Sequence, residues 1–265
     1  MRQVVALACR APSIGNSQPW RWAASDERIE LWADRTQWLG ATDPDSRQLI
    51  VSCGAALHHA RVAAAGLGRP TAVVRQPRPD EPDLLASLYL RRGSPTPGAL
   101  AELAALEQRR TDRRRFTSWP MAEDRLATLI QAVDTPGVHV VSLADHGVRT
   151  TLDRLVINAT GSAQTLLPSD GLLALATDTD DTIARLRAGE ALSQLWLRAT
   201  TDGLSVVPIS EVVESPSTHE VLANEVLGGL VHPQLLIRVG WQEIGGREAL
   251  RSPRRPLSEV LEVIG

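Results

Sequence analysis

The stretch RQLIVSCGAALHHARVAAAGLG, from Arg47 to Gly68, decides the fold. Its apolar spacing predicts one long helix with a face of small residues, ended by glycine. A second stretch, TIARLRAGEALSQLWLRATTDGL (Thr182–Leu204), predicts a helix of the same kind. When Gly54 is superposed on Gly189, alanine, leucine and glycine positions coincide at a constant offset of 135 residues. The offset indicates an internal duplication, although the matching residue types are common and chance is the alternative.

Each of the two predicted helices leads into a β-branched segment, RPTAVVRQ (69–76) in one case and LSVVPISE (204–211) in the other. These segments predict strands. Four further strands are expected at 28–34, 138–143, 172–178 and 233–241. Pro-rich segments at 75–83 and 91–100 predict loops, and a helix is expected over 99–110. The result is a mixed α/β layout whose order leaves parallel and antiparallel pairing open.

The bulk composition is that of an ordinary globular protein. The chain has 265 residues, 43% of them hydrophobic, and a formal net charge of −3. That charge argues against nucleic acid or an anionic membrane as partner of the whole chain. No apolar run approaches the roughly 20 residues that span a bilayer, and the N-terminal residues predict a helix, not a signal peptide. Cys9 and Cys53 form no CxxC pair, which predicts reduced thiols in a cytoplasmic protein.

All 28 basic residues are arginine. Chemistry that needs lysine, such as a Schiff base or a P-loop contact, is therefore excluded, and every cationic contact must be a guanidinium. The segment EQRRTDRRRF (107–116) places five arginines in seven positions, and RSPRRP (251–256) adds a second cluster. Arginine forms bidentate hydrogen bonds with dianions, so the two clusters could close on one phosphate. A solvated helix end or a nucleic-acid patch is the alternative for the first cluster.

Other chemistries lack a motif. HExxH, CxxC, GxSxG, GxGxxG and Walker A patterns are absent from the sequence. His58 and His59 are adjacent on a predicted helix, so they point in different directions and are poorly placed to share a metal. Asp180 and Asp181 are better explained as a helix N-cap than as an acid/base pair. The sequence predicts no catalytic side chain and no metal site.

One loop motif remains, PSIGNSQPW at 12–20. Together with RRTDRRRF (109–116), GLSVVPIS (203–210) and PRRP (253–256), it resembles the nitroreductase family of FMN-dependent flavoproteins, in particular its internally duplicated Acg-type branch. The resemblance implies an α+β, nitroreductase-like fold with two pseudo-symmetric halves, each a mainly antiparallel sheet flanked by helices. The first half, 1–105, would keep the loop and the second, 106–265, the phosphate site. One FMN site across the halves and a monomeric pseudo-dimer are then expected.

The resemblance also assigns residues. Pro12, Ser13 and Ile14 would lie against the isoalloxazine, while Asn16 and Gln18 hold the loop in shape. Arg113 would lie near flavin N1 and O2. Glu190 and Gln194 are weaker candidates. The remaining expected FMN contacts are those to phosphate and ribityl, Arg109, Arg110, Thr111, Arg254 and Arg255, and those approaching N5 and O4, Pro208, Ile209 and Ser210.

The implied activity is hydride transfer from NADPH or NADH to the flavin, then reduction of a nitro-aromatic, a quinone or a similar small acceptor. An FMN-sequestering protein with little turnover, acting in a stress response, is the alternative, and an arginine-rich nucleic-acid binder is a third possibility. Members of the branch carry a longer insertion before the strand at 172–178, where this chain has only INATGSAQTLLPSDG (157–171). A shorter segment there would leave the flavin more accessible.

Overall fold

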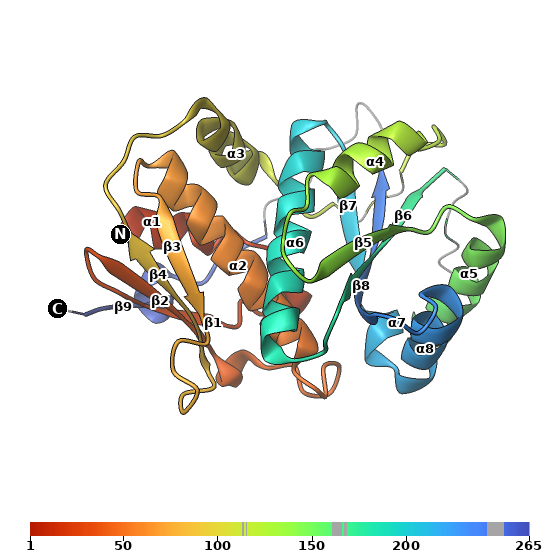
Figure 1. Cartoon of the computed structure of the whole chain (residues 1–265), viewed down its shortest axis with the longest axis horizontal. Coiled ribbons are helices and arrows are strands. Elements are labelled where there is room, and N and C mark those ends of the chain that lie inside the picture. The colour runs from red at the N-terminus through yellow and green to blue at the C-terminus, as the bar shows by residue number, and fades with distance from the viewer. Residues whose placement is uncertain (113, 115, 161–165, 167–168, 243–251, 265) are drawn as a thin grey trace.

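Two lobes lie side by side around a central pair of helices (Figure 1). This computed structural model describes residues 1–265 except 113, 115, 161–165, 167–168, 243–251 and 265. The central helices are α2 (Arg47–Gly66) and α6 (Thr182–Thr201). Both were expected from the sequence, and each lies between the sheet of its own lobe and the other helix.

The first lobe contains a five-stranded sheet in the order β3-β4-β2-β1-β9. Its members are β1 (Trp20–Ala24), β2 (Arg28–Ala33), β3 (Thr71–Arg75), β4 (Leu84–Leu90) and β9 (Leu261–Val263). The pairs β1–β2, β2–β4 and β3–β4 are antiparallel, and β9 runs parallel to β1. The predicted strands at 28–34 and 69–76 are thus confirmed.

The second lobe contains a four-stranded sheet in the order β5-β6-β8-β7, with every pair antiparallel. Its strands are β5 (Val138–Ser142), β6 (Gly171–Thr177), β7 (Ser205–Ile209) and β8 (His232–Gly240). All four lie where the sequence predicted strands. β6 is buried along its whole length, because α6 covers one face of the sheet and the group around α5 and α7 covers the other.

The two sheets repeat one topology. Reading β3-β4-β2-β1 against β7-β8-β6-β5 gives the same order, with the central helix between the second and third strands along the chain in both lobes. The lobes are therefore pseudo-symmetric, and the fold is α+β with mainly antiparallel sheets. The division at residues 105/106 stays a prediction, and β9, from beyond it, belongs to the first sheet.

Shorter helices surround this frame. They are α1 (Arg2–Ala8), α3 (Pro97–Gln108), α4 (Glu123–Gln131), α5 (His146–Thr160), α7 (Glu211–Glu214), α8 (Pro216–Val221) and α9 (Leu257–Val260). Two 3₁₀ turns (Ile14–Asn16 and Arg35–Gln37) and a π-helical turn (Leu222–Val226) complete the described elements. Thr96 caps α3 and Asp181 caps α6, each by a side-chain oxygen that accepts a backbone N–H. The expectation that Asp181 is an N-cap is confirmed.

The central helices cross at the two superposed glycines. A Cβ on Gly54 would lie 2.0 Å from the carbonyl oxygen of Leu186, and a Cβ on Gly189 would lie 2.0 Å from that of Val51. The two environments are equivalent, since Val51 and Leu186 are also 135 residues apart. Glycine is needed here because only a residue without a side chain lets two helix backbones approach so closely.

Candidate functional site

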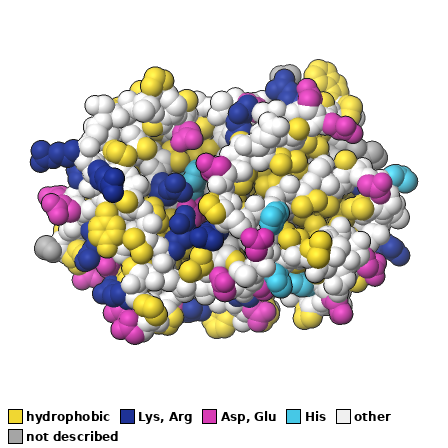
Figure 2. All heavy atoms as spheres, viewed as in Figure 1, with side chains coloured by type: hydrophobic (Ala, Val, Ile, Leu, Met, Phe, Trp, Pro, Cys, Tyr) yellow, Lys and Arg dark blue, Asp and Glu magenta, His cyan; other side chains and the backbone are white. Residues whose placement is uncertain are grey.

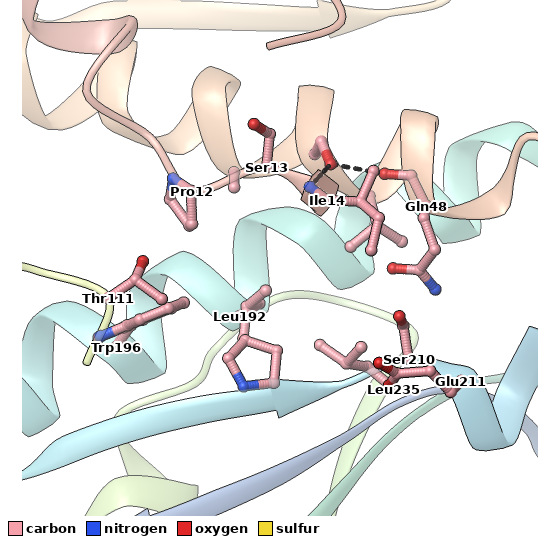
Figure 3. A pocket seen from close by; sticks show the side chains of 14 residues that line it. Pro12, Ser13, Ile14, Gln48, Thr111, Leu192, Trp196, Ser210, Glu211 and Leu235 are labelled. Atoms are coloured by element: carbon pink, nitrogen blue, oxygen red, sulfur yellow. Dashed lines mark hydrogen bonds between the residues drawn. The ribbon is translucent and has the colours of Figure 1, made fainter. Parts of the chain in front are cut away.

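A cavity of about 110 Å³ opens between the lobes. Figure 3 shows the loop of Pro12, Ser13 and Ile14 on one side and the end of β7, with Ser210 and Glu211, on the other. The remaining lining residues come from both halves: Gln48, Val51, Ser52 and Ala55 of α2, Leu192 and Trp196 of α6, and Thr111, Pro208 and Leu235.

The loop is held in place by its own hydroxyl and by α2. The backbone N–H of Gln18 donates to Ser13 Oγ at 3.0 Å. The N–H of Ile14 donates to Ser52 Oγ at 3.1 Å (Figure 3). Gly15 adopts a φ of +55°, where a side chain would be strained, and a Cβ there would meet Leu39 at 3.0 Å. The loop therefore presents a fixed surface to the cavity.

Asn16 and Gln18 fasten this loop to the C-terminal segment. Asn16 Nδ2 donates to the carbonyl oxygen of Pro253 at 3.1 Å, and Gln18 Oε1 accepts the backbone N–H of Arg255 at 2.9 Å. Trp20 follows as a fully buried core residue. These contacts match the shape-holding role expected for Asn16 and Gln18.

Two guanidinium groups converge beside the loop. Arg109 Nη2 and Arg254 Nη2 both donate to the carbonyl oxygen of Arg10, at 2.9 and 3.0 Å. Among the described residues, no carboxylate pairs with Arg109 or Arg254, and the Nε atom of each is buried without a partner. Burial and the neighbouring Arg254 and Arg10 lower the pKa of Arg109 to about 9, and burial also lowers that of Arg254. The cluster therefore concentrates positive charge beside the loop.

Arg109 also connects the cluster to the cavity wall. Its Cζ lies 4.9 Å from the ring centroid of Trp196, and its Nη1 is 3.4 Å from Thr111 Oγ1. Trp196 and Thr111 both line the cavity. A guanidinium stacked on an indole has a fixed direction, so the positive charge lies at one end of the cavity.

The other predicted basic residues are placed differently. Arg255 lies apart, because its guanidinium pairs with Asp34 at 3.1 Å and with Glu259 at 3.6 Å. Arg110 is half-buried and does not line the cavity. Arg113 lies outside the described residues. Of the β7 segment, Pro208 and Ser210 line the cavity, whereas Ile209 packs in the core of the second lobe.

The pseudo-equivalent place on the other side of the helix pair is filled. At the offset of 135 residues, Glu190 corresponds to Ala55, Arg61 to Trp196 and Arg75 to Ser210. Glu190 is only 1% exposed and accepts from Arg75 at 2.6 and 2.9 Å and from Arg61 at 2.9 Å. Figure 2 shows arginine side chains gathered in the middle of that face. Glu190 is thus an ion-pair residue opposite the cavity, and Gln194 bonds to Asp134.

Sequence reasoning missed the helical walls of the cavity. Gln48, Val51, Ser52 and Ala55 lie at the spacing i, i+3, i+4, i+7, which places them on one face of α2. That spacing can be read from the sequence, but residues on a helix face buried in the core are spaced in the same way. Only the crossing of α2 and α6 shows that this face borders a cavity.

Two classes of feature are not seen in the described part of the chain. Within residues 1–265 apart from the gaps given above, no group of three or more His, Cys, Asp or Glu side chains could hold a metal ion. Over the same residues, no helix combines the length and apolar character needed to cross a membrane.

Known proteins of similar sequence carry the name of the family that the sequence motifs resemble. No protein-family model matches the chain. The chain is 36% identical over 312 aligned residues to the proposed NAD(P)H nitroreductase Rv3131 of Mycobacterium tuberculosis, covering 99% of this chain and 91% of the relative. It is 31% identical over 317 residues to the proposed NAD(P)H nitroreductase Acg of the same organism, covering 99% and 95%. Both alignments exceed 265 positions, so the relatives carry residues that this chain lacks.

Among solved structures, the chain is similar to a proposed nitroreductase of Anabaena variabilis. The TM-score is 0.62, the sequence identity is 12%, and the match covers 88% of this chain and 82% of the other. At this identity the likeness shows the fold alone.

Proposed function

The chain belongs to the nitroreductase family, and from that premise we propose that it is an FMN-binding oxidoreductase. It takes hydride from NADPH or NADH and passes it to a small acceptor such as a nitro-aromatic or a quinone. The observation that carries this proposal is the convergence of Arg109 and Arg254 on one carbonyl oxygen, without a carboxylate partner among the described residues.

The cluster fits the phosphate of FMN. A phosphate monoester carries nearly two negative charges and accepts hydrogen bonds from guanidinium groups in pairs. Arg109 is buried and Arg254 is half-buried, and leaving such cations without a counter-charge is costly. A bound dianion relieves their repulsion and accepts hydrogen bonds from the Nε donors of both residues. Thr111 adds a hydroxyl on the path from the cluster into the cavity.

The cavity fits a flat ring system. Pro12, Ser13 and Ile14 lie on one side, and Pro208 and Ser210 lie on the other (Figure 3). When bound, FMN supplies a hydride acceptor and donor that the protein side chains do not. The protein's own part is to hold the ring, exclude water along the apolar walls and place positive charge at one end.

We further propose one FMN per chain, in a monomer whose two lobes act as the two subunits of a pseudo-dimer, divided near residues 105/106. Glu190, Arg61 and Arg75 support the single site, because their ion pairs occupy the place equivalent to the cavity. Arg113 is proposed to lie near flavin N1 and O2. The buried free thiols Cys9 and Cys53 fit a reducing compartment such as the cytoplasm.

The test is an absorbance spectrum of the purified protein with FMN, followed by anaerobic addition of NADPH and then NADH. We expect one FMN per chain and flavin bands that bleach on addition of a nicotinamide. Bands that persist with both nucleotides and bleach only with dithionite would favour the alternative role of FMN sequestration. Failure to bind FMN would overturn the proposal.

A further inference from the structure

A carboxylate beside the cavity has no use in FMN binding. Glu214 closes the one-turn helix α7, and its backbone N–H donates to the carbonyl oxygen of Ser210 at 3.2 Å. Residues four apart on a helical turn share one face, so the Glu214 side chain lies over Ser210 and contacts its hydroxyl. Glu214 Oε1 is buried and has no hydrogen-bond partner among the described residues.

Ser210 connects this carboxylate to the cavity, which it lines from the end of β7. Figure 3 shows Gln48 on the opposite wall, with its side-chain amide directed toward Ser210. Gln48 is 3% exposed, and its Nε2 donor is also buried without a partner in the described chain. An unpaired donor and a hydroxyl therefore face each other across the cavity, an arrangement that suits an acceptor oxygen between them.

The surroundings of Glu214 favour its protonated form. Burial and the nearby carboxylates of Asp43 and Glu211 raise the pKa of Glu214 to about 7, against a lowering contribution from Arg47 and Ser210. Arg47 is largely committed elsewhere, since it forms a bidentate pair with Asp180. A carboxyl group with a pKa near the working pH is suited to donate protons and to recover them.

Four titratable groups on the elements packed against α7 form contacts of their own. His219 of α8 contacts the Val213 carbonyl, and Arg149 of α5 donates to the Asp170 carbonyl. Asp153 of α5 accepts the Leu166 N–H, and Arg238 of β8 pairs with Asp170. Asp43, Glu211 and Arg47 are therefore the charged groups that act on Glu214.

We propose that Glu214 is a proton reserve that acts through the Ser210 hydroxyl on the acceptor bound in the cavity. This inference rests on the proposed function. The acceptor takes a hydride from the reduced flavin, which is thereby oxidised, and an acceptor oxygen takes the Ser210 hydroxyl proton. The O–H bond of Glu214 breaks as its proton replaces the one that Ser210 gave. The Glu214 carboxylate then regains a proton from water.

The first test needs no bound flavin. Difference infrared spectra of the protein at about pH 6 and about pH 8 should show a protonated carboxyl band that disappears as pH rises and is missing in Glu214→Gln. The variant is expected to fold, because glutamine keeps the shape and removes a buried charge. A band unaffected by Glu214→Gln would overturn the proposal.

The second test uses the FMN-loaded protein, reduced with dithionite and mixed with benzoquinone in a stopped-flow instrument. In the wild type, the rate should fall about tenfold per pH unit above about pH 7. Glu214→Gln and Ser210→Ala should each lower the rate below pH 7 and abolish this fall, and Glu214→Asp should restore it. An unchanged pH profile in Glu214→Gln would overturn the relay alone, whereas loss of FMN binding in the wild type would overturn the proposed function and the relay with it.

Discussion

The two sides of the α2–α6 pair differ in what lies at equivalent positions. On one side, Ala55, Trp196 and Ser210 border a cavity. On the other, the residues 135 positions away are Glu190, Arg61 and Arg75, and they form ion pairs that fill the space. The helix crossing itself is the same from both sides, since each glycine meets the other helix in an equivalent way.

This difference shows what a duplicated chain permits. In a symmetric homodimer, a change from alanine to glutamate on the helix face would alter both sites at once. In a single chain, the two copies vary independently, so one side can keep a binding cavity while the other becomes part of the core. The α2–α6 crossing, which both lobes share, and the two different sides of this helix pair can be tested separately.

The largest effect on stability should come from disrupting the crossing of α2 and α6. Gly54→Ala places a Cβ 2.0 Å from the Leu186 carbonyl oxygen, so the helices must separate. We expect the free energy of unfolding to fall by about 3 kcal/mol or more, and Gly189→Ala to cost a similar amount because its surroundings are equivalent. Urea denaturation measures both.

Gly98→Ala is the matched control, because Gly98 also lies in a helix but a Cβ there would meet only Thr96 Oγ1, at 4.0 Å. It should be neutral or stabilising by up to about 1 kcal/mol. Equal losses at Gly54 and Gly98 would contradict the close crossing.

The side of the helix pair that holds the Glu190 ion pairs should show the next largest effect on stability. Arg75→Leu leaves the buried Glu190 with Arg61 as its remaining ion-pair partner among the described residues, and the Arg61 side chain is itself 44% exposed. We expect a loss of about 3 kcal/mol in the free energy of unfolding. Glu190→Leu should cost less, because both arginines can then reach water. Thermal and urea unfolding of the two variants compare them, and a larger loss for Glu190→Leu would contradict this order.

The cavity side should respond in ligand affinity more than in stability. Arg254→Gln removes one cation from the cluster around the Arg10 carbonyl. A charge-assisted hydrogen bond of about 1.5–3 kcal/mol corresponds to an FMN affinity about 10- to 100-fold weaker. Titration by flavin fluorescence gives the dissociation constant.

Arg255→Gln is the neighbouring control, since Arg255 pairs with Asp34 and not with the cluster. Its FMN affinity should change by less than about threefold. Equal weakening in both variants would place Arg255 in the phosphate site and correct the assignment made above.

The smallest effect concerns the helix contact itself. His58 Nδ1 lies 2.8 Å from Ser193 Oγ, and these residues are again 135 positions apart. Burial lowers the pKa of His58 to about 3 and that of His59 well below its ordinary value. The unfolded chain gains protons below about pH 6.5 and the folded chain does not, so stability is lost as pH falls.

Between about pH 6.5 and about pH 5, we expect His58 to account for a loss of about 2 kcal/mol. His58→Ser should reduce the slope of stability against pH in this window, as measured by urea unfolding. His232→Ser, at the exposed start of β8, is the control and should leave the slope unchanged. A slope that is not reduced in His58→Ser would show that another group, such as His59, is responsible.

Much of the fold could be predicted from the residue pattern of short segments. The long helices, the β-branched strands and the offset between Gly54 and Gly189 are properties of short segments, and the structure confirms them. The sequence pattern does not assign the strand Leu84–Leu90, because an unbroken apolar run does not distinguish a buried strand from a helix. The predicted helix at 99–110 ends at Gln108, two residues early, where Arg109 takes an extended conformation.

The site was predictable only where a motif is contiguous. Ser13 and Thr111 both line the cavity and belong to recognisable segments. Arg254 and Arg255 are neighbours in one motif, yet one enters the cluster and the other pairs with Asp34, which no sequence pattern distinguishes. Glu190 on the opposite face, and Glu214 beside Ser210, depend on tertiary contacts between segments far apart in the chain.

The parallel strand β9 has a consequence for synthesis on the ribosome. The first sheet receives Leu261–Val263 only after the whole second lobe has been translated, and the neighbouring Pro253 and Arg254 reach the loop at Asn16 at the same late moment. Contacts that join residues more than 230 positions apart form slowly. The sheet of the N-terminal lobe therefore stays incomplete until the C-terminal residues are synthesised. Until then the edge of β1 is unpaired, and a chain stalled before β9 would expose that edge to aggregation.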